Sequence, residues 1–221
     1  MRGANLDLYL SAGYFRMQQT VFTCRFVYFE SVFSGVHWLR IDLERAQFGK
    51  KQRDLLKIKQ KFSVAVLPFI LTAELETLYA RYRNAIDFDA PDTVESSLLS
   101  GSLTNAFDTY MVHIRDAGKL IAVGIFDDGL DSIAGIMNFY DPDYRKYSPG
   151  KTLMLLKMEY ARQQQKTYYY PGYIASNYPK LNYKLFACEA ATEVYDDYTD
   201  TWLPFSWDTI NMLLEGNLSR Y

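Results

Sequence analysis

Cysteine is scarce in this sequence of 221 residues. Its two cysteines, Cys24 and Cys188, stand far apart, and no third or fourth cysteine accompanies them. A disulfide framework or a Cys-rich zinc or iron–sulfur site requires several cysteines at characteristic spacings. The sequence therefore argues against both kinds of site, and we expect neither a bound metal nor a cofactor.

An excess of one charge and long apolar runs are also lacking. The chain carries 24 Lys and Arg against 26 Asp and Glu, a formal net charge of −2. It has no apolar stretch of the ~18 residues that a membrane span needs, and no basic leader followed by an apolar run and a cleavage site. We expect a soluble, cytoplasmic protein without a membrane partner, in which any site for a polyanion is a local basic patch.

Apolar and aromatic residues are plentiful. Hydrophobic residues make up 49% of the chain and aromatic residues 16%, which is typical of a globular protein and excludes global disorder. The length favours one or two domains.

Residues 1–67 are predicted to form a β-rich N-terminal subdomain with a basic segment. The segment 40–61 holds eight basic and three acidic residues, so it is either a nucleic-acid surface or simply a solvated face. A turn at Ser34–Gly35 is expected to make a hairpin of the two strands around it. The expected elements are a short helix near residues 6–10 and strands over 20–33, 36–43 and 62–67.

Residues 68–108 are predicted to be a helix and an acidic linker. Leucines and tyrosines at helical spacing over 71–83, after Thr72, indicate an amphipathic helix. Residues 84–108 carry five acidic residues, no basic residue and several turn-forming residues, so a loop or a short helix with loops is expected there.

Residues 109–221 show a pattern of strands and one long helix. Asp-containing turns before Gly118 and Gly129 separate three β-prone runs, and such turns favour antiparallel hairpins. Ser148 is expected to cap a helix that Pro149 begins. This order predicts an α+β fold with a mixed sheet flanked by helices, like that of the acyl-CoA N-acyltransferases (GNAT-like). The expected elements are strands at 109–115, 119–126, 132–140 and 167–174, a helix at 149–164, a turn at 179–185 and an acidic tail at 189–207.

The sequence around this helix resembles a phosphate-binding loop only in part. Gly150-Lys151-Thr152 matches the end of the motif, but Arg145 stands where its first glycine is required, which argues against a nucleoside triphosphate. A helix N-terminus with Arg145, Lys146 and Lys151 beside it still suits a phosphate or a carboxylate. The alternative is an ordinary capped surface helix.

Tyrosines gather in the same part of the chain. Ten of the 19 tyrosines lie between Tyr140 and Tyr183. Because side chains alternate along a strand, Tyr168 and Tyr170 are expected to point to one face and Tyr169 to the other. Either one of these faces is core and the other a cleft, or the tyrosines form a tyrosine-rich sheet core. His37 and His113 have no serine or carboxylate at a spacing that suggests a catalytic triad, so both are expected to be structural.

Several motifs in order resemble the arginyl-tRNA–protein transferases and their bacterial leucyl relatives. The family's cysteine cluster, reported to hold a metal or an iron–sulfur centre, is reduced here to Cys24. The matching segments are Ala12-Gly13-Tyr14-Phe15-Arg16, Leu39-Arg40-Ile41, Lys50-Lys51-Gln52-Arg53, Lys119 to Gly124, Phe139 to Tyr144, Tyr168 to Ile174 and Pro179 to Lys184.

The resemblance implies an enzyme that moves an amino acid, arginine or leucine, from its tRNA to the α-amino group of a protein with an acidic N-terminal residue, in the N-degron pathway of protein degradation. Its partners would be aminoacyl-tRNA and such proteins. Two alternatives remain open at this point: an acyl-CoA-dependent N-acyltransferase on the same fold, and an inactive module that binds acidic N-termini.

The resemblance also assigns roles to residues. Tyr140, Asp141 and Tyr170 would take part in catalysis, with Asp141 near an α-ammonium group. The substrate-binding residues would be Tyr169, Tyr173, Lys180 and Lys184. The tRNA-binding residues would be Arg16, Arg40, Lys50, Lys51 and Arg53.

Overall fold

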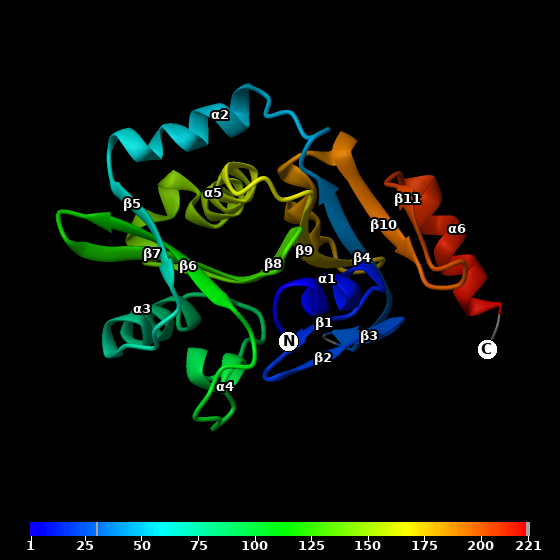
Figure 1. The fold of residues 1–221 in the computed structure, drawn as a ribbon, viewed down its shortest axis with the longest axis horizontal. Coiled ribbons are helices and arrows are strands. Elements are labelled where there is room, and N and C mark those ends of the chain that lie inside the picture. The colour runs from blue at the N-terminus through cyan, green and yellow to red at the C-terminus, as the bar shows by residue number, and fades with distance from the viewer. Residues whose placement is uncertain (30, 220–221) are drawn as a thin grey trace.

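A computed structural model describes residues 1–29 and 31–219. Their strands form a nine-stranded mixed sheet in the order β11-β10-β4-β9-β8-β7-β6-β5, with β3 also paired to β4, and a separate two-stranded sheet of β1 and β2 (Figure 1). The strands are β1 Phe15–Met17, β2 Thr20–Phe22, β3 Phe26–Phe29, β4 Val32–Asp42, β5 Ser63–Pro68, β6 Thr109–Asp116, β7 Lys119–Asp128, β8 Ser132–Tyr140, β9 Tyr168–Ala175, β10 Thr192–Asp196 and β11 Thr201–Pro204.

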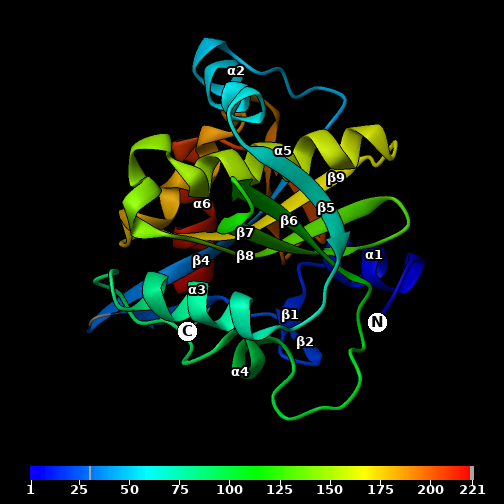
Figure 2. The same ribbon diagram turned by 90° about the vertical axis from the view of Figure 1, so that its left-hand side faces the viewer.

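The helices cover both faces of the sheet. Figure 2 shows α2 and α5 on one face and α3 and α4 on the other. The α-helices are α1 Ala4–Ser11, α2 Lys50–Leu56, α3 Ala73–Arg83, α4 Val94–Leu98, α5 Pro149–Gln163 and α6 Trp207–Leu218, and the 3-10 helices are η1 Lys57–Gln60, η2 Pro142–Tyr147, η3 Pro179–Phe186 and η4 Glu189–Ala191.

The predicted meander of β6, β7 and β8 is confirmed. All three strands pair antiparallel, and the first turn places Ala117 and Gly118 at φ values of 46° and 91°, the positive pair that a tight hairpin turn needs. In the β7–β8 pairing, Ile125 faces Met137 and Phe126 faces Gly135. Ile136 is therefore an extra residue in β8, a β-bulge of the kind that often lies beside an active site.

The returning strand β9 is also confirmed, and it makes the sheet mixed. It runs parallel to β8 only where Ser132–Ala134 pair with Tyr168–Tyr170. Beyond these residues β9 continues antiparallel to β4, so β8 and β9 separate. The meander, the covering helix α5 and this parallel strand form the GNAT-like α+β arrangement that the sequence predicts.

Three expectations about local structure are corrected. Ser34 and Gly35 lie inside β4, where they pair with Val27 and Phe26, so they are not the hairpin turn. Ser148 has a left-handed backbone (φ 49°) and makes no side-chain cap on α5. The acidic segment 189–207 is no tail, because β10 pairs with β4 and extends the sheet. By contrast, Thr72 caps α3 as predicted, since its hydroxyl accepts a hydrogen bond from the Leu75 N–H at 3.2 Å.

The predicted division at residues 67 and 108 does not separate sheets. β4 pairs with β9, and β5 pairs with β6, so residues 1–67 contribute strands to the same sheet as residues 109–221. Because residues 1–67 supply both an edge strand and a central strand to this sheet, they share one hydrophobic core with residues 109–221.

Two apolar layers fill the space on either side of the sheet. Val112, Ile114 and Phe126 pack under α5 and α2, whereas Met111, Val123 and Ile125 pack under α3 and α4. Strand residues alternate between these layers as the period of two requires. None of the helices in the described residues is long and apolar enough to cross a bilayer.

Candidate functional site

The separation of β8 from β9 opens a pocket of about 240 Å³ inside the sheet, here called the inter-strand pocket. Glycine keeps its wall open, because a Cβ at Gly135 would lie 2.5 Å from the Tyr169 hydroxyl. Its lining comes from β1, β2, β4, β8, α5, β9 and η3, and consists of Phe15, Arg16, Phe22, Trp38, Gly135, Ile136, Met137, Asn138, Met154, Lys157, Tyr169, Pro171, Gly172, Tyr173, Tyr183 and Lys184.

A second pocket of about 580 Å³ lies at the N-terminal end of α5, here called the helix-end pocket. It combines aromatic rings with basic side chains and the first residues of the helix. Its lining consists of Tyr82, Phe88, Asn138, Tyr140, Arg145, Ser148, Gly150, Lys151, Tyr178, Lys180, Leu181 and Tyr183.

Asn138 and Tyr183 line both pockets, so the two cavities meet at these side chains. The Asn138 amide nitrogen donates to the Gly150 carbonyl at 3.4 Å. Its Oδ1 is buried and has no hydrogen-bond partner within the described residues. A buried acceptor without a donor costs free energy, so this oxygen favours a ligand N–H or O–H at the junction.

Lys157 is a pocket residue that the sequence analysis did not single out. It lies on α5 with 1% of its surface exposed and lines the inter-strand pocket. Its Nζ donates to the carbonyls of Ile125 (2.6 Å) and Met137 (3.3 Å). Burial lowers the pKa of Lys157 to about 7, with Asp127 opposing the shift. The sequence signal that could have identified Lys157 is its position among the apolar residues of the amphipathic helix predicted at 149–164.

Lys184, predicted to bind substrate, reaches the same pocket from η3. Its Nζ donates to the Tyr173 carbonyl at 2.5 Å and lies 5.0 Å from the centroid of the Tyr173 ring. Burial lowers the pKa of Lys184 to about 7 as well. The pocket thus contains two lysines whose amines exchange protons near neutral pH.

The predicted tyrosines are divided between the pocket and the core. Tyr169 and Tyr173 line the inter-strand pocket. Tyr170 is only 2% exposed and packs against Phe15 and Trp202, with ring centroids 6.0 and 5.6 Å apart. Tyr170 therefore lies outside the pocket, a correction to its predicted place among the catalytic residues, because the alternation along β9 sends it to the opposite face.

Tyr140, predicted to be catalytic, lines the helix-end pocket, but its neighbour Asp141 does not. Asp141 has no exposed surface, and its carboxylate forms ion pairs with Lys119 at 2.7 Å and Arg81 at 3.0 Å. It also caps η2 by accepting from the Asp143 N–H. Its pKa stays below the usual value, because Lys119, the Asp143 N–H and Arg81 outweigh burial. The structure therefore gives Asp141 a structural position, a correction to its predicted contact with substrate.

Arg16 and Arg40 are also placed differently from the prediction. The Arg16 side chain is 1% exposed and pairs with the buried Asp127 at 2.8 Å. Arg40 pairs with Glu193 at 2.7 Å and stacks on Tyr168 and Trp202. Both guanidinium groups are engaged inside the protein, so neither presents a free surface charge to a tRNA backbone.

Lys50, Lys51 and Arg53 are exposed on α2, the outermost helix on its face of the sheet (Figure 1). Lys180 lines the helix-end pocket and lies 3.6 Å from the Asp87 carboxylate. Lys50, Lys51 and Arg53 thus lie where a tRNA backbone could reach them, and Lys180 lies where a bound substrate could reach it.

The described residues contain no group of three or more His, Cys, Asp and Glu side chains that could hold a metal ion. His37 is buried, contacts the Ser176 hydroxyl at 2.8 Å and has its pKa lowered to about 4 by burial. It lines neither of the two pockets, which agrees with the structural role expected of it.

Comparison with known families matches residues 74–187 to the family model described as "Arginine-tRNA-protein transferase, C terminus". Curated relatives with similar sequences are called aspartate/glutamate leucyltransferases. The relative from Leptospira interrogans is 26% identical over 183 residues, which cover 76% of this chain and 71% of that protein. The relative from Teredinibacter turnerae is 31% identical over 139 residues, which cover 62% of this chain and 57% of that protein.

Solved structures with similar folds have low sequence identity. The structure of L-PGS from Bacillus licheniformis has a TM-score of 0.46 at 14% identity, and the match covers 78% of this chain and 50% of the L-PGS chain. The crystal structure of FemX has a TM-score of 0.44 at 9% identity, and the match covers 79% of this chain and 60% of the FemX chain.

Proposed function

The chain belongs to the arginine-tRNA-protein transferase family, and from this membership we propose that it transfers leucine from leucyl-tRNA to the α-amino group of proteins that begin with aspartate or glutamate. The choice of leucine and of acidic acceptors is supported by the names of its relatives, the aspartate/glutamate leucyltransferases. The observation that carries the proposal is the pair of pockets that meet at Asn138 and Tyr183. A transfer between two large substrates requires two such sites with a common boundary.

The helix-end pocket suits the aminoacylated 3′ end of the tRNA. The N-terminus of α5 exposes backbone N–H groups, and Arg145 and Lys151 stand beside it, which favours phosphate. Rings such as Tyr82 and Tyr140, whose centroids lie 5.2 Å apart, offer faces on which an adenine base can stack.

The inter-strand pocket suits the N-terminal residue of the acceptor protein. Aromatic and aliphatic side chains form much of its wall, and two lysines line it: Lys157, which is buried, and Lys184, which is half-buried. The acceptor amine then meets the ester carbonyl at the junction beside Asn138. Holding the amine and the ester in this geometry can supply about 7–11 kcal/mol of the activation barrier.

Lys184 is the candidate general base in this arrangement. An α-ammonium has a pKa of about 7.7–8.0, close to the pKa of about 7 of Lys184, so a proton passes between them at little cost. The amine nitrogen attacks the ester carbonyl carbon, a C–N bond forms, and the bond to the ribose oxygen breaks. Of the two protons that the nitrogen loses, one goes to Lys184 and one ends on the ribose oxygen.

The test is a transfer assay with the purified chain. Radiolabelled Leu-tRNA, Arg-tRNA and acetyl-CoA are offered as donors, each with peptides that begin with Asp, Glu or Ala. We expect label from Leu-tRNA on the Asp and Glu peptides and none on the Ala peptide. Label from acetyl-CoA alone would contradict the proposal in favour of an acyl-CoA-dependent enzyme. Binding of acidic peptides without any transfer would contradict it in favour of a binding module.

A further inference from the structure

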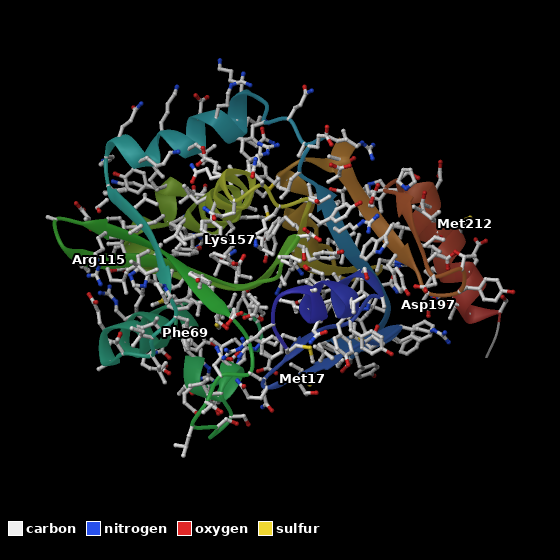
Figure 3. All side chains as sticks on the ribbon, viewed as in Figure 1. Met17, Phe69, Arg115, Lys157, Asp197 and Met212 are labelled. Atoms are coloured by element: carbon white, nitrogen blue, oxygen red, sulfur yellow. The ribbon has the colours of Figure 1, made fainter. Side chains whose placement is uncertain are left out.

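Lys157 is the most deeply buried cation of the inter-strand pocket. Figure 3 shows it in the interior, between α5 and the sheet, whereas labelled residues such as Arg115 lie at the periphery. Only 1% of its surface is exposed. Room for it comes from Gly124, where a Cβ would lie 2.9 Å from Lys157 Cε and 2.9 Å from Asn138 Oδ1. Lys157 and Asn138 therefore flank the same glycine, next to the junction of the two pockets.

The Lys157 ammonium has no carboxylate partner at ion-pair distance in the part of the chain that the structure describes. The nearby Asp127 carboxylate uses its Oδ1 to accept from Arg16 Nη1 at 2.8 Å and from the Thr109 hydroxyl at 2.6 Å, and its buried Oδ2 has no hydrogen-bond partner within the described residues, Lys157 included. Arg16 uses its remaining N–H groups on other partners, among them the Leu98 and Gln18 carbonyls. A buried charge without a counter-ion is costly, so the position of Lys157 favours an incoming anion.

The bonding capacity of Lys157 also leaves a place for a ligand. An ammonium has three N–H donors, and the carbonyls of Ile125 and Met137 take two. The side chain lines the pocket, so the third N–H is available to an acceptor atom that enters it. A carboxylate oxygen is the strongest such acceptor.

From this geometry we infer that Lys157, at the floor of the inter-strand pocket, recognises the side-chain carboxylate of the acceptor's N-terminal Asp or Glu and so determines acceptor specificity. This inference rests on the proposed function, because it assumes that the acceptor enters this pocket. An acceptor that begins with Asn or Gln carries an amide in place of the carboxylate. Its neutral oxygen forms a weaker hydrogen bond with the Lys157 ammonium than a carboxylate oxygen does.

Binding of an acidic residue is then coupled to protonation. A carboxylate beside Lys157 raises its pKa from about 7, so above neutral pH the complex takes up a proton. The other titratable or charged groups that face this region are Arg16 on β1, Asp127 on β7, Tyr169 and Tyr173 on β9, and Tyr183 and Lys184 around η3. Burial raises the pKa of Asp127 to about 6, with Arg16 opposing the shift, and it also raises the pKa values of Tyr169 and Tyr173. Above pH 7, Lys157 and Lys184 are therefore the groups of this set that titrate.

The test compares Lys157→Met with a matched control, Lys166→Met. Lys166 also donates to two backbone carbonyls, those of Gly129 and Leu130, but lies outside both pockets. Transfer is measured to peptide pairs that begin with Asp or Asn and with Glu or Gln. We expect Lys157→Met to reduce the preference for the acids, as a ratio of kcat/KM, by about 10- to 100-fold, mainly through KM, and Lys166→Met to leave the preference unchanged. An unchanged preference in a folded Lys157→Met protein would overturn the inference.

A second measurement uses the wild-type protein and no tRNA, so it remains valid if the variant does not fold or if transfer is absent. Calorimetric titration with the Asp and Asn peptides at pH 8, in two buffers of different ionisation enthalpy, gives the number of protons taken up. The Asp peptide should take up close to one proton more than the Asn peptide. Equal uptake by the two peptides would exclude Lys157 as the recognition group, whereas a failure of the wild type to transfer leucine would count against the proposed function alone.

Discussion

At the scale of single residues, the two lysines of the inter-strand pocket, Lys157 and Lys184, differ in the roles that their contacts allow. Lys157 is held by two carbonyls at the pocket floor, whereas Lys184 has one backbone acceptor, the Tyr173 carbonyl. Sequence resemblance pointed to Lys184 but not to Lys157, because a lysine on a helix face is normally solvated and only the packing of α5 on β7 and β8 reveals its burial. Conversely, Arg16 and Asp141 lie in segments that match family motifs, yet both side chains are buried in ion pairs. Arg16 pairs with Asp127, and Asp141 pairs with Lys119 and Arg81.

Lys184 offers a prediction at this scale. Lys184→Met and Lys184→Arg should both lower the leucine transfer rate, by about 10²-fold at pH 6.5, because neither side chain accepts a proton from the acceptor ammonium. The loss should be smaller at pH 8.5, where most of the free α-amine is already neutral. Single-turnover rates over this pH range test it. A Lys184→Arg variant with the wild-type rate would show that only the positive charge matters.

At the scale of secondary-structure elements, local signals were sufficient for most boundaries. The meander, α3 with its Thr72 cap and the returning strand β9 follow from turn residues, capping residues and apolar periodicity, all of which act over a few residues. The strands β10 and β11 were missed because their acidic residues resemble a solvated segment. Pairing of β10 with β4 stabilises them, and that pairing joins residues more than 140 positions apart.

The helix α2 carries the element-scale prediction. A triple variant, Lys50→Ala with Lys51→Ala and Arg53→Ala, should weaken tRNA binding at 100 mM salt and reduce the slope of log Kd against log salt by about 1 for each phosphate that is no longer neutralised. Lys57→Ala is the control, because Lys57 is already paired with Asp54 at 2.7 Å. Fluorescence anisotropy with labelled tRNA measures both quantities. Identical slopes for the triple variant and the wild type would remove α2 from the tRNA surface.

At the scale of the whole molecule, the buried lysines make stability depend on pH. Between pH 7 and 9 an unfolded chain keeps both lysines protonated, whereas the folded chain loses protons from Lys157 and Lys184. The free energy of unfolding therefore rises with pH, by up to about 1.4 kcal/mol per pH unit for each lysine. Asp127 acts in the opposite direction only below this window, because burial raises its pKa to about 6.

Urea unfolding at pH 7, 8 and 9 measures this slope. Lys157→Met should reduce it by about one half, because one of the two titrating lysines is gone. A wild-type protein whose stability stays constant or falls between pH 7 and 9 would contradict the lowered pKa values of the two lysines.

By itself the sequence determined most of the local elements before β10, the α+β class and the family, because turns, caps, periodicity and short motifs depend on neighbouring residues. The tertiary structure decided which side chains meet. The separation of β8 from β9, the division of Tyr169 and Tyr170 between pocket and core, and the approach of Lys157 and Lys184 to one cavity all depend on strand register and helix packing between distant segments. These contacts have no signature within any short stretch of the chain.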